Sequence, residues 1–331
     1  MRIARLAWVG LVLAACGSSK AGSSFDGGLG AGADATVDGS GGASSSGGSS
    51  GSGSGGSFGD GSPGDGGATC TPPDMLIVLD HTDSMSATPN GGNPANTDAG
   101  HELTKWVLAT EAVKAVVAPP QDQKVAFGLE LFPLDPATVT DAGGTGKCRT
   151  LTELLSGTAS NNTSCQPAEI PIPPAVGTGN AITSLLDPET LRLCVSTPIA
   201  LALGTAKAEL AAIAQPKVAQ YVLLVTDGGE TCNGDVVAAA QDMAAAGVKT
   251  FVVGFGSADA GAAGVKTGLL DQAACAGQTA IGFPAPCTET DAGYTAKSTT
   301  GVPIFYLAED GASLQATLQS ITSKICCGCA Q

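Results

Sequence analysis

Histidine and basic residues are scarce in this chain of 331 residues. The only two histidines, His81 and His101, do not form a spaced set of ligands, so a zinc site built from histidines or a Ser-His-Asp hydrolase has little to work with. Lysine and arginine total 15 against 30 aspartates and glutamates, which gives a formal net charge of -15. Because no basic cluster offsets this charge, electrostatic binding to nucleic acid is excluded.

Residues 1–16 have the features of an export signal. Two arginines precede an apolar run, Leu6 to Ala14, that is too short to span a bilayer permanently. The segment Leu13-Ala14-Ala15-Cys16 resembles the bacterial lipobox, in which the cysteine is acylated and becomes the mature N-terminus. We therefore expect a signal peptide at residues 1–15 and a lipid anchor on Cys16. The alternative is an ordinary cleaved signal with a coincidental cysteine.

The tract after Cys16 is expected to be a flexible linker that extends to residue 69. From Gly17 to Thr69, 34 of the 53 residues are glycine or serine, and few large apolar side chains are available for burial. Such a coil holds a domain on the order of 40 Å from its anchor. Gly17 stands where an aspartate would suggest retention in the inner membrane of some bacteria, so the outer membrane is favoured.

From Cys70 onward, short apolar runs alternate with alanine-rich and leucine-rich segments at helical spacing. The apolar runs suit strands covered on both faces, and they are residues 75–79, 125–132, 221–225, 250–255 and 304–307. The helical segments are residues 101–117, 198–213, 236–246, 265–276 and 311–325. This order predicts an α/β domain over residues 70–329, with a doubly wound, mostly parallel sheet flanked by helices. Residues 133–191 break the pattern and contain two cysteines, which predicts a surface insertion.

Two of the buried runs lead directly into an aspartate. Asp80 follows the first run and Asp227 the third, and ligands of an open parallel sheet bind beyond the carboxyl ends of its strands. Thr82 and Ser84 follow Asp80, and Thr197 precedes a proline suited to the start of a helix. Two carboxylates and three hydroxyls form an all-oxygen set that suits Mg²⁺, with Ca²⁺ or Mn²⁺ as alternatives. The competing interpretation is that the aspartates only cap turns or helices.

This pattern resembles the metal-ion-dependent adhesion site of von Willebrand factor type A domains. The family pattern is D-x-S-x-S after the first strand, a threonine in a later loop and an aspartate that ends a central strand. Five residues match it in order, with a threonine in place of the first serine: Asp80, Thr82, Ser84, Thr197 and Asp227. The resemblance spans about residues 72–325 and implies a Rossmann-like fold. It also implies a bound divalent cation with an open coordination position for an acidic group of a protein or glycan partner.

Two residues of the first motif depart from the family pattern or fill a variable position in it. Asp83 stands where the family often has glycine, so it would either strengthen cation binding or occupy the place of a partner's carboxylate. His81 is expected to be an exposed loop residue rather than a ligand. Together with the export signal and Cys16, the resemblance predicts a lipid-anchored extracytoplasmic binding module. We do not expect an enzyme, because the constellation contains no nucleophile–base pair. The alternative is a structural cell-envelope lipoprotein whose metal site only stabilises the fold.

Ten cysteines remain after Cys16, an even number that favours disulfides in an exported chain. Cys194 and Cys232 lie near Thr197 and Asp227 in the sequence, so we expect them to bond to each other at the rim of the site. A bridge from Cys70 to the cysteines at 326–329 would fasten the two ends of the domain. The alternative for that cluster is a zinc knot that includes Cys70.

Overall fold

The structure is a computed structural model that describes residues 70–135, 148–157, 165–258, 264–298 and 301–327. All of them belong to one compact unit, residues 55–331. The expected signal peptide, Cys16 and the linker lie outside the described residues. Within the described part, none of the helices combines the length and the hydropathy needed to span a bilayer.

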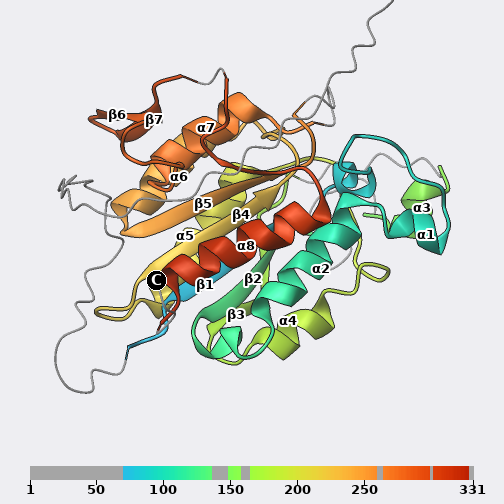
Figure 1. Ribbon diagram of the computed structural model, residues 1–331, viewed down its shortest axis with the longest axis horizontal. Helices are drawn as coiled ribbons and strands as arrows, with labels where there is room; N and C mark the ends of the chain where they lie inside the picture. Colours follow the sequence, from blue (N-terminus) through green and yellow to red (C-terminus); the bar gives the residue numbers. More distant parts are fainter. Residues whose placement is uncertain (1–69, 136–147, 158–164, 259–263, 299–300, 328–331) are drawn as a thin grey trace, which may run out of the picture. The chain divides into compact units, whose positions relative to one another are not determined.

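A six-stranded sheet forms the centre of the domain (Figure 1). The strands lie in the order β3-β2-β1-β4-β5-β8, and β3 alone runs antiparallel to its neighbour. Their bounds are Asp74–Asp80 (β1), Ala126–Phe132 (β2), Glu169–Ala175 (β3), Gln220–Thr226 (β4), Val248–Phe255 (β5) and Tyr306–Ala308 (β8). The sheet is therefore mostly parallel, as the apolar runs predict.

Helices cover both faces of this sheet, which explains why its central strands are mostly apolar. Successive side chains of β1 alternate between two clusters: Ile77 packs with α2 and α8, whereas Val78 packs with α5, α6 and α7. Helices α2 and α8 lie side by side on one face (Figure 1). The helix bounds are Asp98–His101 (α1), Lys105–Val117 (α2), Leu151–Leu155 (α3), Gly179–Leu185 (α4), Ile199–Ile213 (α5), Val236–Ala245 (α6), Thr267–Ala276 (α7) and Gly311–Ile325 (α8).

The predicted insertion contributes to the sheet as well as to the surface. Its strand β3 pairs with β2 and forms one edge, where Pro171, Pro173 and Pro174 are tolerated because an edge strand need not donate every backbone hydrogen bond. The prolines also protect that edge from pairing with another chain. A second, two-stranded sheet of β6 (Cys287–Thr290) and β7 (Gly293–Ala296) lies outside the predicted elements.

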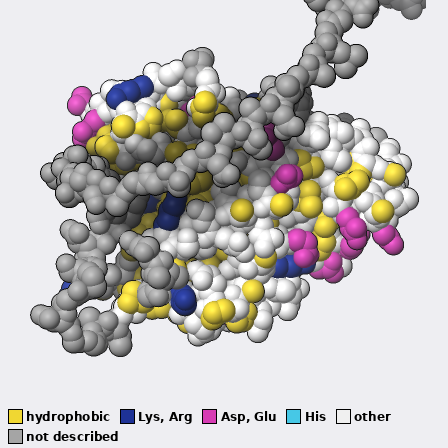
Figure 2. Space-filling view, in the orientation of Figure 1, with side chains coloured by type: hydrophobic (Ala, Val, Ile, Leu, Met, Phe, Trp, Pro, Cys, Tyr) yellow, Lys and Arg dark blue, Asp and Glu magenta, His cyan; other side chains and the backbone are white. Residues whose placement is uncertain are grey.

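On the part of the face that Figure 2 leaves uncovered, lysines and arginines occur at separate places and form no patch. This distribution agrees with the absence of a basic cluster in the sequence.

The predicted bond between Cys194 and Cys232 is wrong. Cys194 bonds to Cys148 and Cys232 bonds to Cys165, with Cα–Cα distances of 4.5 and 5.6 Å. The reason is the path of the insertion: Leu193 and Arg149 exchange backbone hydrogen bonds, which brings Cys148 next to Cys194. Both bridges therefore attach the insertion to the loops that contain Thr197 and Asp227.

The expected bridge between the ends of the domain is confirmed, because Cys70 bonds to Cys327. Cys326 is disulfide-bonded as well, so these three cysteines do not supply thiolates for the alternative of a zinc knot. A further bond, Cys275–Cys287, joins α7 to β6.

Peptide mapping of the unreduced protein tests this connectivity. We expect crosslinked peptides that join Cys148 to Cys194 and Cys165 to Cys232, because the Cα–Cα distances of both pairs suit a disulfide. The same map after reduction is the control, since every crosslinked peptide should then separate. A crosslink between Cys194 and Cys232 would contradict the structure.

Candidate metal centre

The two aspartates predicted at strand ends lie together. Asp80 ends β1 and Asp227 follows β4, and these neighbouring strands are parallel and in register. Both residues are buried, with relative exposures of 0% and 1%. Burial, and then the charge of Asp227, raise the pKa of the Asp80 carboxyl above its usual value. Two acidic groups thus share a buried place that favours a compensating positive charge.

Both carboxylate oxygens of Asp80 accept hydrogen bonds from neighbouring residues. The backbone N–H of Thr82 donates to Oδ1 at 2.9 Å, and the hydroxyl of Thr226 donates to Oδ2 at 2.6 Å. These bonds oppose the rise in the pKa of Asp80, because they stabilise the ionised carboxylate. They also fix the orientation of the side chain, as supporting residues commonly do around metal sites.

The hydroxyls of the first motif connect to Asp227. The Ser84 hydroxyl donates to Oδ1 of Asp227 at 2.8 Å, and the hydroxyl oxygens of Ser84 and Thr82 lie 2.9 Å apart. On the other side of the carboxylate, Oδ2 of Asp227 forms an ion pair with Nζ of Lys105, although no hydrogen bond of regular geometry reaches this oxygen. Lys105, the first residue of α2, was not among the predicted site residues.

Thr197, the fifth predicted residue, lines one pocket together with Ser84 and Asp227. This pocket has a volume of about 380 Å³, and the loop 228–231 forms much of its remaining wall. The N–H of Thr197 donates to the hydroxyl of Thr231 at 2.6 Å, and the N–H of Thr231 donates back to the carbonyl of Thr197. The structure therefore places Ser84, Thr197 and Asp227 on the pocket, while Asp80 and Thr82 support them from within.

The donor set fits a hard divalent cation. Every predicted residue offers a carboxylate or hydroxyl oxygen, which Mg²⁺, Ca²⁺ and Mn²⁺ accept, and the pocket leaves room for water. Asp227 Oδ2 lies beside the ammonium of Lys105, so Oδ1, which contacts Ser84, is the oxygen of this carboxylate next to a pocket-lining hydroxyl. A second cluster of potential ligands, Asp135 with Cys148 and Cys194, does not fit a metal, because the two cysteines are bonded to each other.

Asp83, the departure from the family pattern, is partly buried next to the site and is not one of the pocket-lining residues. Burial raises the pKa of its carboxyl, whereas the charge of Arg149 lowers it. Arg149 thus offsets the negative charge that Asp83 adds.

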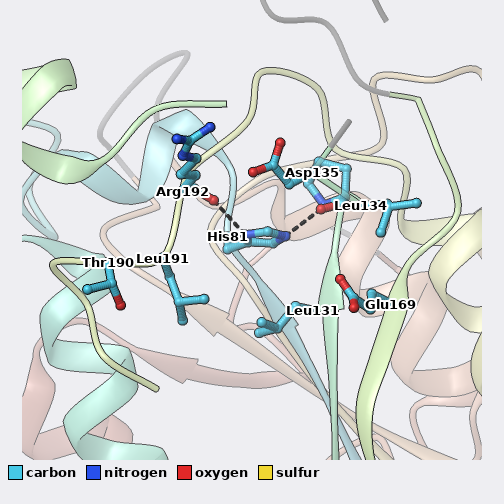
Figure 3. A pocket seen from close by; sticks show the side chains of 9 residues that line it. His81, Leu131, Leu134, Asp135, Glu169, Thr190, Leu191 and Arg192 are labelled. Carbon is cyan, nitrogen blue, oxygen red and sulfur yellow. Dashed lines mark hydrogen bonds between the residues drawn. The ribbon is translucent and has the colours of Figure 1, made fainter. Parts of the chain in front are cut away.

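His81 is buried, so the expectation of an exposed loop residue is wrong. Its relative exposure is 5%, and its ring lies between two backbone carbonyls (Figure 3). Nδ1 lies 2.8 Å from the carbonyl oxygen of Arg192, and Nε2 contacts that of Pro133. Burial lowers the pKa of this imidazole, and the two carbonyls oppose that shift. His81 therefore connects the loop after β1 to Pro133 and Arg192 at the two ends of the insertion. The sequence does not show that these residues cover His81.

Residues 190–268 match the model of the von Willebrand factor type A domain family, and the mostly parallel sheet flanked by helices is the architecture that the resemblance implies. The matched segment contains Thr197 and Asp227, whereas the motif from Asp80 to Ser84 lies before it. The search of curated proteins returned no match.

Solved structures with a similar arrangement share little sequence with this chain. An aerotolerance-related membrane protein from Bacteroides fragilis is 18% identical, with a TM-score of 0.36, over 56% of this chain and 69% of that one. Manganese-loaded TRAP protein from Plasmodium vivax is 14% identical, with a TM-score of 0.45, over 79% of this chain and 76% of that one. Proximal thread matrix protein 1 from the mussel byssus, with a zinc-occupied MIDAS motif, is 12% identical, with a TM-score of 0.43. This chain is covered over 77% of its length and the mussel protein over 48%.

Proposed function

We propose that this chain is a binding module that captures a protein or glycan partner through a divalent cation. Ser84, Thr197 and Asp227 would hold the cation at the pocket, with Thr82 and Asp80 in support, and Mg²⁺ is the proposed ion, with Ca²⁺ or Mn²⁺ as alternatives. The observation that carries this proposal is the convergence of five oxygen-bearing side chains from three separate segments on one strand-end site. An open coordination position would accept an acidic group of the partner.

The residues of this chain would prepare that site before a partner arrives. Thr226 and the N–H of Thr82 fix Asp80, while Thr231 fixes Thr197. The cation supplies positive charge to two buried carboxylates and a coordination position for an anionic group. Because the supporting groups are already oriented, binding costs little reorganisation of the loops.

A binding role fits the site better than an enzymatic one. The Ser84 hydroxyl donates to the Asp227 carboxylate, and both ring nitrogens of His81 face backbone carbonyls. In the described geometry, His81 therefore does not act as a base that would activate the Ser84 hydroxyl. The remaining alternative is a cation that only stabilises the fold. The two roles differ in whether the cation keeps an exchangeable coordination position.

Water-proton relaxation of the Mn²⁺-loaded protein separates these two roles. We expect bound Mn²⁺ to enhance relaxation, because an open position exchanges water, and we expect acetate to reduce the enhancement by competing for it. The Mn²⁺-loaded protein without acetate is the reference. Bound Mn²⁺ without any enhancement would indicate a closed coordination shell and favour the structural alternative.

The proposed location is the cell envelope. Residues 1–15 would form the signal peptide, Cys16 would carry the lipid, and residues 16–69 would link the anchor to the domain at residues 70–329. Outer-membrane attachment is the favoured form of this proposal.

Mass spectrometry of the mature N-terminus tests the anchor. We expect a peptide that begins at Cys16 and carries several acyl chains, because one chain alone anchors only marginally. The matched variant Cys16→Ser should leave the membrane fraction. An unmodified N-terminus downstream of Cys16 would refute lipid attachment.

A further inference from the structure

Lys105 is a buried cation built into the candidate metal site. Its side chain is fully buried, and its ammonium forms the ion pair with Asp227. Its backbone N–H donates to the carbonyl of Ala87 at 2.8 Å. Buried lysines are rare in proteins unless a carboxylate compensates their charge. The position of Lys105 at the start of α2 therefore delivers a positive charge to the centre of the site.

The fold also provides space for the aliphatic stem of this lysine. Gly256, just after β5, has a φ of 127°, and a Cβ there would lie 3.4 Å from Cδ and 3.9 Å from Nζ of Lys105. A larger residue with this backbone conformation would be strained, and its Cβ would lie 3.2 Å from the carbonyl oxygen of Pro89. Gly256 at the end of β5 therefore lies next to the Lys105 side chain.

The Asp227 carboxylate is consequently shared between two cation positions. Oδ1 accepts the hydrogen bond of Ser84, which lines the pocket, whereas Oδ2 contacts the ammonium of Lys105. A divalent cation held by Ser84 and Asp227 would lie close to that ammonium. Like charges in a buried site repel strongly, because the surrounding dielectric screens them poorly.

We propose that Lys105 determines how tightly the site binds its divalent cation. In the metal-free protein the ammonium compensates Asp227 and holds the carboxylate in place; when a divalent cation binds, the same ammonium opposes it. The carboxylates of Asp80 and Asp227 would balance a divalent cation alone, and Glu230 and Lys266 on the pocket carry opposite charges. Lys105 therefore leaves the loaded site with one surplus positive charge. Arg149 offsets the neighbouring Asp83. This inference rests on the metal-binding function proposed above.

Titration calorimetry with Mg²⁺ on the chelator-stripped full chain tests the proposal. We expect Lys105→Met to bind Mg²⁺ at least about tenfold more tightly than the wild type, because a methionine of similar length removes only the opposing charge. Lys114→Met is the matched control: this lysine lies on the same helix but pairs with exposed Glu111, so its loss should leave Mg²⁺ affinity unchanged.

Thermal unfolding provides a readout that does not depend on calorimetry. In EDTA, Lys105→Met should unfold at a lower temperature than the wild type, because Asp227 has lost its compensating charge. Mg²⁺ should raise the unfolding temperature of Lys105→Met by more than it raises that of the wild type. Lys105→Gln, which keeps a donor near Asp227, should change in the same direction as Lys105→Met.

The outcomes separate this inference from the proposed function. If the wild type binds Mg²⁺ and folded Lys105→Met or Lys105→Gln binds it no more tightly, the role of Lys105 is overturned while metal binding stands. If the wild type and the Lys105 variants all show no saturable binding, the metal-binding function fails and the inference fails with it.

Discussion

Replacing Asp227 by asparagine is expected to lower the free energy of unfolding of the metal-free protein by about 3–5 kcal/mol, because the ammonium of Lys105 then lies buried without its counter-ion. Asparagine keeps nearly the same shape and still accepts a hydrogen bond from Ser84, so packing changes little. The double variant Asp227→Asn/Lys105→Met replaces both charges by neutral groups and should recover most of this loss. Denaturant unfolding in EDTA measures all three proteins and the Lys105→Met variant, which closes the cycle.

Recovery of stability should not be accompanied by recovery of metal binding. Both proteins with asparagine at 227 lack the Asp227 carboxylate, the acidic group that Ser84 contacts at the pocket, and hard divalent cations depend on such ligands. A double variant as unstable as Asp227→Asn would show that the ion pair with Lys105 is not the source of the loss.

Replacing Glu130 by glutamine is expected to stabilise the protein increasingly as the pH rises. Glu130 lies in the centre of β2, fully buried, and both of its carboxylate oxygens lack hydrogen-bond partners. Burial, and then the charge of Glu209, raise its pKa from 4.5 to about 9. Between these values the folded protein keeps a proton that the unfolded chain releases, so the contribution of Glu130 to stability is complete below pH 4.5 and is lost as the pH rises towards about 9.

The variant cannot ionise, so its advantage over the wild type should grow by about 1.4 kcal/mol per pH unit between roughly pH 5 and pH 8. Denaturant unfolding across this range measures the difference. Glu111→Gln is the control, because Glu111 is exposed and its surface ion pair with Lys114 should contribute little at any pH. A difference between Glu130→Gln and wild type that does not change with pH would contradict a neutral, buried Glu130.

The central sheet was predictable because its strands are covered on both faces. Continuous apolar runs such as the one in β4 are stable only when both of their faces are buried. Their alternation with helical segments then predicts that neighbouring strands run parallel. Strand β3 escaped prediction because three prolines and a partly exposed pattern are unlike a buried strand. The β6–β7 hairpin escaped because its strands are short and largely exposed.

The predicted ligand residues converge because two of them, Asp80 and Asp227, stand at the ends of neighbouring parallel strands. The residues that surround them depend on tertiary structure. The partners of Cys194 and the burial of His81 both follow from the path of the insertion, which no local pattern encodes. Lys105 gave no sequence signal, since a lysine at the first position of an amphipathic helix is ordinarily exposed. Glu130 gave one: a carboxylate within the otherwise apolar run 125–132 marks a buried charged group.

Calorimetric titration of the chelator-stripped protein with Mg²⁺, Ca²⁺ and Mn²⁺ tests the proposed metal centre most directly. We expect saturable binding of one cation per chain, stabilisation of the fold by about 2.7 kcal/mol at a hundredfold excess over the dissociation constant, and retained binding in Thr82→Ser, which keeps the hydroxyl. Binding should be lost in Asp227→Asn. No saturable binding in the wild type, or undiminished binding in Asp227→Asn, would contradict a cation held at this site.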